Sequence, residues 1–387
     1  MATEPVRALI LSGGGGRGAF HAGVYKYLMQ NNKENIDPDH AGAWEPQIIV
    51  GTSIGAVNGA AIAQGMSADQ LAEVWKTLEE QDIQGLPPGM RGIARWIARA
   101  IFKEIMDAKL PQIPPEEATS PIPKEFWPPL PLLPRWIAGK LIGYWINLLD
   151  TGPLRKTLFT RFGLDEEKLA ASTKSLLIAA TKVRTGERIL FSNREVKDQK
   201  RRERRRDVFT GITADRILAS CSIPLVYPWT FDPGTESYYW DGALVANTPL
   251  GAAIDMMGGD TSIPAEVVVV MMTPWWESDD PAPVKAETEP KSFGDAITWM
   301  LDWMLLASFR ENLKMIRAFN DLALREREEG STPYRYRIVT PLIVSPLEFL
   351  QAERIIDYDG DVSARLIEEG YKAAKYAFEQ AFPNPQC

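Results

Sequence analysis

Residues 48–63 read IIVGTSIGAVNGAAIA, and the expected fold can be worked out from this stretch. The apolar run Ile48–Val50 is typical of a buried strand, and the small residues over 56–64 favour a helix. Between them, Gly51–Gly55 fits the pattern G-x-S-x-G, which lifts a serine above a sheet on a strained strand-to-helix turn. The glycines allow close backbone approach, and the following helix points its positive end at Ser53. Ser53 is therefore a candidate nucleophile, and a tight packing turn without chemistry is the alternative.

A similar strand–turn–helix unit precedes this one. Ala8–Leu11 is a short apolar run, Ser12–Gly18 is a glycine-rich loop, and Ala19–Met29 has helical spacing. Two such units in succession imply an α/β fold in which helices cover a parallel sheet.

The loop Gly13–Gly18 has two functional interpretations. It fits G-x-G-x-x-G, the dinucleotide-binding fingerprint, and it also offers the free backbone amides that an oxyanion hole requires. A dinucleotide site needs an acidic residue about 20 residues further on, at the end of the second strand. Here that strand ends in Gly51-Thr52-Ser53 instead. The oxyanion hole is favoured, with the loop amides facing Ser53; a purely structural glycine turn is the third possibility.

Histidine, the usual base of serine hydrolases, is scarce in this chain. Only His21 and His40 are present, and neither follows Ser53. His21 lies about one turn into the first predicted helix, where it either approaches the site or is a satisfied helix residue. His40 lies in a polar loop and is expected to be solvated. The base is therefore expected to be a carboxylate.

Asp241 is the best candidate for that carboxylate. It follows the short aromatic strand Tyr238–Trp240 and precedes Gly242, so it stands at a strand end on a tight turn. Burial beside aromatic residues raises the pKa of a carboxyl group and makes it a better base. The alternative is that Asp241 only initiates the turn.

Composition limits the classes of function. The chain is 45% apolar and 24% charged, with a net charge of −8, which argues weakly against nucleic-acid binding. Its two cysteines, Cys221 and Cys387, cannot form a disulfide framework or a zinc site, which fits a reducing compartment. Residues 1–7 lack the features of a secretory signal, and no apolar segment reaches the ~20 residues of a membrane span. A cytoplasmic or peripheral membrane protein is expected.

The chain as a whole, 1–387, is predicted to be one catalytic domain with two additions. Residues 85–150 form a predicted helical insertion around the proline-dense stretch 111–134, and residues 278–330 form a predicted helical addition. Further elements are expected at the following places: strands over 175–182 and 188–191 joined as a hairpin, strands over 266–272 and 336–340, a helix or helix pair over 292–329, and a helix over 362–382.

Four segments raise the question of lipid contact. Arg91, Arg95, Arg99 and Lys103 share one side of a predicted helix with apolar neighbours, and tryptophan-rich residues 135–149 form a second amphipathic stretch. These two stretches either form a lid or membrane-docking surface or simply pack onto the domain, and the sequence favours neither. The run 299–305 suits either core packing or an acyl-chain pocket. The basic run 200–206 favours a solvated loop, with contact to anionic headgroups as the alternative.

Taken together, the motifs resemble the patatin-like phospholipase family. The glycine loop, the serine elbow and the Asp241-Gly242-Ala243 turn agree with that family in order and spacing. Segments 219–224 and 245–249 also look like the family. The resemblance covers about residues 7–80 and 150–275 and, faintly, the C-terminal helix.

The resemblance implies a three-layer α/β/α fold with a central, mostly parallel sheet, and a Ser–Asp dyad. Ser53 would be the nucleophile and Asp241 the proton acceptor, with an oxyanion hole from the amides of Gly14, Gly15 and Gly16. The other motif positions carried over are Gly13, Arg17, Gly18, Gly51, Gly55 and Gly242.

In function, the resemblance implies a hydrolase of carboxylic esters in phospholipids, lysophospholipids or acylglycerols. The expected partner is a lipid or membrane-surface substrate, not a nucleic acid, and no metal or cofactor is expected. A nucleotide-dependent oxidoreductase that uses the glycine loop, and a lipid transacylase that uses the same dyad, are the alternatives.

Overall fold

The computed structural model describes residues 4–30, 43–85, 149–196, 205–258, 260–276, 289–290, 293–330, 334–348 and 358–381. Several predicted features lie outside the described residues: His40, nearly all of the insertion with its proline-dense stretch and two amphipathic helices, and residues 200–204 of the basic run.

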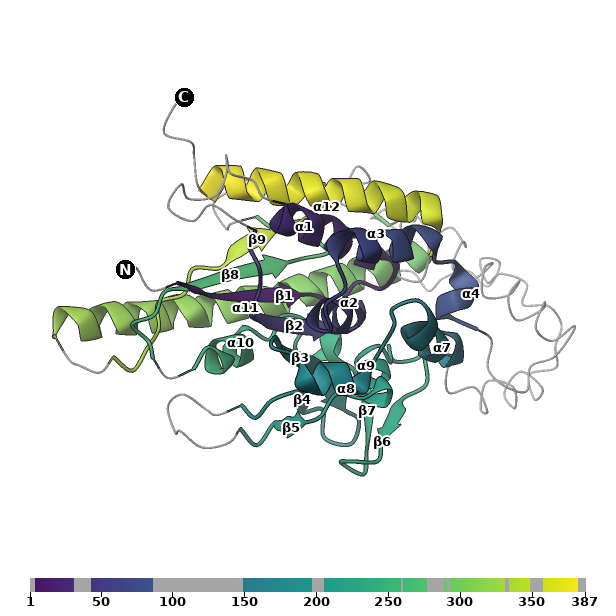
Figure 1. The fold of residues 1–387 in the computed structure, drawn as a ribbon, viewed down its shortest axis with the longest axis horizontal. Helices are drawn as coiled ribbons and strands as arrows, with labels where there is room; N and C mark the ends of the chain where they lie inside the picture. The colour runs from purple at the N-terminus through teal and green to yellow at the C-terminus, as the bar shows by residue number, and fades with distance from the viewer. Residues whose placement is uncertain are drawn as a thin grey trace, which may run out of the picture.

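A nine-stranded mixed sheet forms the centre of the described chain (Figure 1). Its main path runs β5-β4-β3-β2-β1-β8-β9, and the neighbours from β3 to β9 along this path are parallel. The strands are β1 Val6–Leu11, β2 Ile48–Thr52, β3 Ser175–Lys182, β4 Arg188–Ser192, β5 Val208–Thr210, β6 Thr230–Asp232, β7 Ser237–Asp241, β8 Ala265–Val270 and β9 Leu342–Val344. β3 pairs with β4 antiparallel, which confirms the predicted hairpin.

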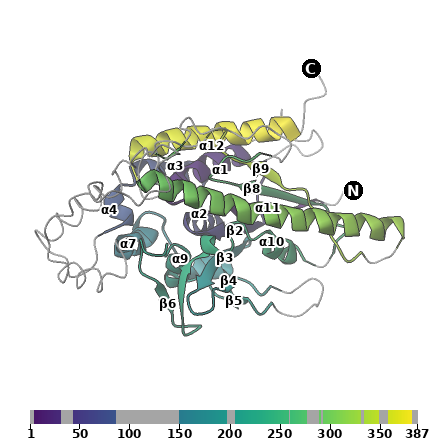
Figure 2. The same cartoon turned by 180° about the vertical axis from the view of Figure 1, so that it is seen from behind.

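Helices cover both faces of the sheet, as Figures 1 and 2 show from opposite sides. They are α1 Ala19–Met29, α2 Ile54–Ala63, α3 Ala68–Thr77, α4 Glu80–Ile83, α7 Gly152–Thr160, α8 Glu166–Ala171, α9 Ala214–Ser220, α10 Leu250–Met256, α11 Phe293–Glu328 and α12 Gly360–Ala381, with short 3-10 turns η1 Gly15–Gly18 and η3 Gly242–Leu244.

Alternation along the strands divides the core in two. Leu9 and Leu11 of β1 join the cluster beneath α1, α2, α3 and α12, whereas Ala8 and Ile10 join the cluster beneath α10 and α11. β1 is apolar on both faces because helices cover both. This arrangement confirms the three-layer α/β/α fold with a mostly parallel central sheet.

Two strands meet end to end beside β3, and this junction positions the candidate site. β2 runs parallel to β3 as far as the pair Thr52 and Ala179. β7 then continues along β3, antiparallel to it, and its last residue Asp241 is paired with Ala180. The last residue of β7 therefore lies at the point where β2 ends and the chain turns into Ser53.

The ends of the predicted insertion lie side by side. Gly85 and Asp150 exchange two backbone hydrogen bonds, with N···O distances of 3.0 and 2.7 Å. The chain thus leaves the described fold at 85 and returns to it at the same place, as an insertion would. The division of the chain into a catalytic domain with two additions stays a prediction.

The C-terminal helix α12 packs directly on α1. A Cβ on Gly23 of α1 would lie 1.9 Å from the carbonyl oxygen of Ile367, and a Cβ on Gly370 of α12 would lie 2.1 Å from that of Phe20. Only glycine allows the two backbones to approach so closely. Helices that are more than 300 residues apart in sequence are therefore fixed together.

One predicted strand is wrong. Residues 336–340 form no strand; the last strand is β9, two residues further on. The backbone amides of Tyr336 and Val339 donate instead to side chains of α11, Glu326 at 3.3 Å and Asn320 at 3.0 Å. Side chains of one continuous helix therefore take the hydrogen bonds that a neighbouring strand would have supplied.

Within the described ranges, no helix combines the length and the apolar character that a membrane crossing requires.

Candidate active site

Ser53 stands on a strained turn between β2 and α2. Its φ of 55° and ψ of −127° lie outside the conformations that non-glycine residues usually adopt, and its side chain is buried. The flanking glycines make the turn possible: a Cβ on Gly51 would lie 2.3 Å from the carbonyl oxygen of Gly55, and one on Gly55 would lie 2.2 Å from that of Leu11. The local geometry is that of a nucleophile elbow.

Asp241 faces Ser53 across the junction of β2 and β7. The Ser53 hydroxyl donates to Asp241 Oδ2 with an Oγ–Oδ2 distance of 2.6 Å. Asp241 Oδ1 accepts from the backbone amide of Ala243 at 2.8 Å. The backbone of Asp241 is itself held: its amide donates to Ser222 O at 2.9 Å, and Thr181 Oγ1 donates to its carbonyl oxygen at 2.9 Å.

Burial sets the acid–base behaviour of Asp241. Removal from water raises the pKa of its carboxyl group to about 7, while the hydrogen bonds from Ser53 and Ala243 act in the opposite direction. A carboxylate with this pKa is poised to accept a proton near neutral pH, which a solvated aspartate with its ordinary low pKa does poorly.

His21 does not take part in this contact. It is fully buried in α1, and burial lowers its pKa to about 3, so the imidazole is neutral at physiological pH. Its Nδ1 lies 3.2 Å from Asn58 Nδ2, which also donates to Gly18 O at 2.9 Å. Trp75 Nε1 donates to Asn58 Oδ1 at 2.9 Å. His21 thus belongs to a network that ties the end of the glycine loop to α2 and α3.

The glycine loop lies against Ser53. A Cβ on Gly13 would be 3.0 Å from Ser53 Cβ, and the amide of Gly13 donates to Asn247 Oδ1 at 2.7 Å. The next three amides, those of Gly14, Gly15 and Gly16, have no hydrogen-bond partner among the described residues. The loop that carries these three amides therefore begins in contact with the nucleophile, and their role as an oxyanion hole stays a prediction.

Ser220 and Asn247 position this site, and reasoning from the sequence gave them no role. Ser53 N donates to Ser220 Oγ at 2.8 Å, and Ser220 Oγ donates to Ala179 O at 2.6 Å, which fixes the elbow to β3. Both residues fall in segments that resemble the family, 219–224 and 245–249. That resemblance was the available signal, but it did not indicate which atoms they contact.

A buried ion pair ties the glycine loop to α11. Arg17 Nη1 lies 2.8 Å from Asp302 Oδ1, and both side chains are only 3% exposed. Thr273 Oγ1 donates to the same carboxylate oxygen at 3.0 Å. In the sequence, Asp302 is a single acid within the apolar run Trp299–Leu306. Its partner depends on tertiary structure.

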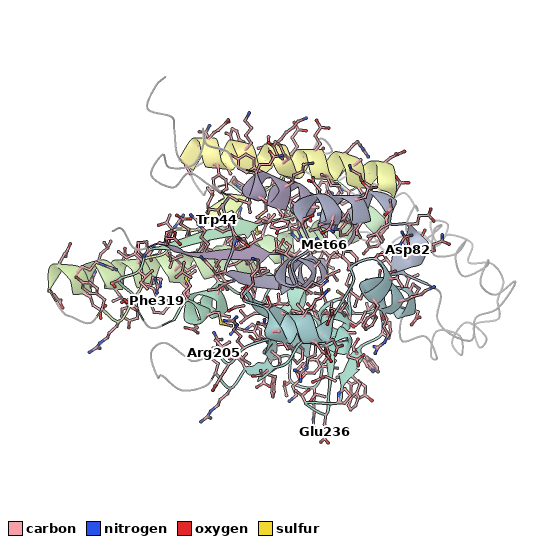
Figure 3. All side chains as sticks on the ribbon, in the orientation of Figure 1. Trp44, Met66, Asp82, Arg205, Glu236 and Phe319 are labelled. Carbon is pink, nitrogen blue, oxygen red and sulfur yellow. The ribbon has the colours of Figure 1, made fainter. Side chains whose placement is uncertain are left out.

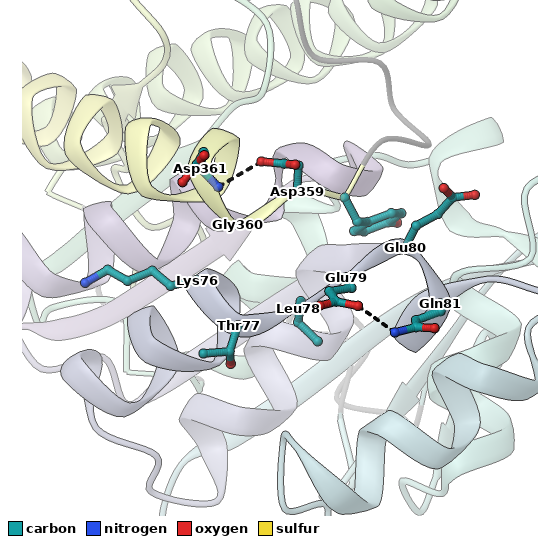
Figure 4. A pocket seen from close by; sticks show the side chains of 10 residues that line it. Lys76, Thr77, Leu78, Glu79, Glu80, Gln81, Asp359, Gly360 and Asp361 are labelled. Carbon is teal, nitrogen blue, oxygen red and sulfur yellow. Dashed lines mark hydrogen bonds between the residues drawn. The ribbon is translucent and has the colours of Figure 1, made fainter.

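Three surface grooves of the described chain lie away from the dyad. The groove in Figure 4 lies between the α3–α4 turn and the beginning of α12, and its lining includes the acidic residues Glu79, Glu80, Asp359 and Asp361. Two further grooves are lined by residues from 64–77 with 160–168, and from 251–255 with 316–339. Neither Ser53 nor Asp241 lines any of the three. Among the described residues, no group of three or more His, Cys, Asp or Glu side chains is placed to hold a metal ion.

An elbow serine in contact with a buried carboxylate, on an α/β/α scaffold, is the arrangement of a serine hydrolase that works without histidine. A family model described as Patatin-like phospholipase matches residues 9–254. The chain belongs to this family of lipid acyl hydrolases, which are serine hydrolases with a Ser–Asp dyad. Membership favours the hydrolase over the nucleotide-dependent oxidoreductase.

Two solved structures show distant likeness. The crystal structure of VipD from Legionella pneumophila is 13% identical, with a TM-score of 0.44 over 98% of this chain and 68% of that one. The crystal structure of the type III effector protein ExoU is 11% identical, with a TM-score of 0.34; the alignment covers 99% of this chain but only 54% of ExoU. No curated protein matches the chain. At these values the likenesses carry no argument about function.

Proposed function

We propose that this protein hydrolyses carboxylic esters of phospholipids, lysophospholipids or acylglycerols, with Ser53 as nucleophile and Asp241 as the only acid–base side chain. The contact of 2.6 Å between Ser53 Oγ and Asp241 Oδ2 carries the proposal. It joins the two side chains that the family's dyad requires, on a strained turn and out of water.

Acylation begins when Ser53 Oγ attacks the acyl carbonyl carbon and Asp241 Oδ2 takes the hydroxyl proton. The carbonyl oxygen becomes an oxyanion, which the amides of Gly14, Gly15 and Gly16 stabilise; loss of one such donor typically lowers the rate by about 10²–10³-fold. Asp241 then returns the proton to the departing alkoxide, the C–O bond breaks, and the acyl group stays on Ser53.

Deacylation repeats these steps with water. Asp241, again a carboxylate, accepts a proton from the water that attacks the acyl-enzyme. The second oxyanion collapses, Ser53 receives the proton back from Asp241, and the carboxylic acid leaves. One carboxyl group serves both half-reactions because its raised pKa lets it both accept and donate a proton near pH 7.

Product analysis tests the proposal. Purified protein is incubated with defined phospholipids, lysophospholipids and acylglycerols, and the released fatty acids are measured beside the Ser53→Ala variant. We expect release of free fatty acid by the unmodified protein and a loss of about 10³-fold or more in the variant. A Ser53→Ala variant that keeps most of the activity on a chromogenic ester would refute the mechanism.

The same incubation distinguishes hydrolysis from transacylation. With an added alcohol acceptor, a transacylase produces the new ester in place of the free fatty acid, whereas a hydrolase continues to release fatty acid. The dyad geometry serves either acceptor, so the product ratio decides between them.

A further inference from the structure

The segment that ends just beyond Asp241 carries several exposed apolar side chains. Fourteen large apolar residues of the described chain are exposed, and six of them fall within residues 225–245. Five of the other eight are spread along the 36-residue helix α11, and the remaining three lie on α7, α12 and the loop after β9. The six are Leu225, Trp229, Phe231, Tyr238, Leu244 and Val245. Single exposed apolar side chains are ordinary, but a local group of this kind marks an interaction site.

The β6–β7 hairpin carries aromatic side chains on its outer face and polar side chains on its inner face, the reverse of an ordinary surface hairpin. Phe231 and Tyr238 are directly paired across the two strands, with ring centroids 5.0 Å apart, and Trp229 lies 6.2 Å from Tyr238. These three rings share the outer face. A hairpin face exposed to water would normally carry polar side chains.

The inner face of the same hairpin carries the polar groups. Asp232 is buried and pairs with Arg216 of α9, with an Nε–Oδ1 distance of 3.1 Å. Tyr239 is also buried, and its hydroxyl lies 2.8 Å from Thr235 Oγ1. The buried ion pair fixes the hairpin on the domain, so the aromatic face is held outward and does not depend on the hairpin's own turn.

The apolar face lies on the same strand as Asp241, although alternation turns the Asp241 side chain to the inner face. Tyr238 and Trp240 alternate with Tyr239 and Asp241 along β7, so the outer stripe reaches the residue next to the base. At a rise of about 3.3 Å per residue, Tyr238 lies about 10 Å from Asp241 along the strand. Beyond Asp241 in the chain, Leu244 and Val245 are also exposed.

Leu225, four residues before Trp229 in the chain, is an exposed residue on a strained turn. It is 77% exposed and has a φ of 69°, in the left-handed region that non-glycine residues rarely adopt. The turn that holds it is closed by a hydrogen bond of 2.8 Å from Tyr227 N to Ile223 O. A leucine kept outward at the expense of backbone strain is expected where its side chain has a function.

We propose that Leu225, Trp229, Phe231, Tyr238, Leu244 and Val245 form an interfacial docking face, which inserts into the headgroup–acyl boundary of a lipid bilayer beside the dyad. The proposal rests on the proposed function, since it deepens the description of the same site. Amphipathic Trp and Tyr rings favour this boundary, where the carboxylic esters of glycerolipids also lie. Docking there brings an ester to the end of β7, so the substrate need not pass through water.

Charge on the hairpin indicates what kind of lipid surface fits. Glu236, labelled in Figure 3 at the outer tip of the hairpin, is acidic, and none of the six docking residues is charged. The chain as a whole carries a net charge of −8. Apolar insertion into a zwitterionic surface is therefore the expected mode, and salt should weaken it little, in contrast to a basic docking patch.

The test compares binding to phosphatidylcholine vesicles with catalysis. Binding is measured by co-sedimentation in the Ser53→Ala background, so that lipid is not consumed, at low and at high salt. The docking variant is Trp229→Ser/Phe231→Ser/Tyr238→Ser. Its matched control is Met315→Ser/Leu322→Ser/Leu324→Ser, which removes three apolar residues of comparable exposure from α11.

We expect the docking variant to bind vesicles at least about tenfold more weakly at both salt concentrations, and the control variant to bind unchanged. In the catalytically intact background, hydrolysis of vesicle lipid should fall at least about tenfold more than hydrolysis of a short, water-soluble ester. Unchanged vesicle binding would overturn the proposal. So would an equal loss of both activities in a folded variant, or a self-association of the unmodified chain that the docking variant abolishes.

A single substitution covers the case in which the triple variant does not fold. With brominated phosphatidylcholine, part of the tryptophan fluorescence should be quenched, and Trp229→Phe should remove that part while it keeps an aromatic ring for docking. Quenching that is identical in Trp229→Phe and the unmodified chain would place Trp229 outside the bilayer and contradict the proposal. If Ser53→Ala left hydrolysis intact, the proposed function would fail, whereas vesicle binding would still report on docking alone.

Discussion

The junction of β2 with β7 and the outer face of the β6–β7 hairpin share one strand, yet they depart from ordinary protein structure in opposite ways. At the junction, the carboxyl group of Asp241 is removed from water and its pKa rises to about 7. Three residues earlier, the ring of Tyr238 is 51% exposed beside two further exposed aromatic rings. A polar group is buried at one end of the strand, and apolar groups are exposed at the other.

Each departure lowers the stability of the folded chain, because buried charge and exposed apolar surface are both unfavourable in water. Such local conflicts are expected at functional sites and are rare elsewhere. The two proposals together give their proximity on β7 one explanation: the hairpin face would meet the lipid, and the junction would cleave it.

The largest effect is expected at the buried end of β7. Asp241→Asn keeps the size of the side chain but cannot accept the Ser53 proton, so kcat/KM on a water-soluble ester should fall about 10³-fold. The matched control is Asp255→Asn, which removes a carboxylate that pairs with Arg205 at 2.7 Å outside the site. If the Asp241→Asn variant kept more than about a tenth of the original kcat/KM, Asp241 would not be the catalytic base, and the buried end of β7 would have no special chemical role.

The pH dependence should show which group is the base. Asp241 must be ionised to act, and its pKa is about 7, so kcat/KM should rise about tenfold per pH unit below 7 and level off above it. At pH 5 it should be about 100-fold below the plateau. His21, with a pKa of about 3, cannot produce this limb. A limb of the same shape in the residual activity of Asp241→Asn would assign it to another group.

The same substitution should stabilise the fold at alkaline pH. Because the folded pKa of Asp241 lies above its ordinary value of 3.8, the folded state binds more protons than the unfolded state between about pH 4 and pH 7, and stability contributed by this group is lost as pH rises through 7. Asp241→Asn never ionises, so at pH 8 its free energy of unfolding should exceed that of the unmodified chain by about 4 kcal/mol, which is about 1.4 kcal/mol for each pH unit between 3.8 and 7.

Near pH 4 the two free energies of unfolding should converge. Urea denaturation of both proteins across this pH range measures the difference. A constant difference at all pH values would mean that ionisation of Asp241 carries no unfavourable energy.

The smallest effect is expected at the ion pair that holds the glycine loop. Asp302→Asn keeps an acceptor for Arg17 but removes the charge, so the loop amides should be less precisely placed against the oxyanion. We expect kcat on a soluble ester to fall about tenfold while KM changes little. Asp361→Asn, at the exposed beginning of α12, is the control. A folded Asp302→Asn variant with unchanged kcat would limit the ion pair to stability.

The serine elbow could be predicted from sequence because its determinants lie in sixteen contiguous residues: a strand, two glycines around the serine and a helix. The contact with Asp241 was also anticipated, but its geometry depends on β7 lying beyond the end of β2 along β3. No local pattern specifies that register. The assignment of roles to both residues stays a proposal.

Other features could not be predicted because they depend on distant partners. Residues 336–340 have the composition of a strand, yet side chains of α11 bind the amides of Tyr336 and Val339. Asp302 interrupts an apolar helix in the sequence, and only the fold shows that it meets Arg17. The outward direction of the hairpin aromatics follows from the burial of Asp232 against Arg216. The proposed lid within 85–150 stays a prediction.

The close fit of Gly23 and Gly370 has a consequence for the time at which this chain becomes active. A nascent chain that has reached residue 350 already contains Ser53, Asp241 and the whole glycine loop, but α1, which continues from that loop, still lacks the helix that covers it. We expect ester hydrolysis to appear only once α12 has been synthesised and has docked on α1. Activity would then be delayed until the catalytic fold is complete. Ribosome-bound chains stalled before and after α12, assayed with a fluorogenic ester, would show whether activity begins at that step.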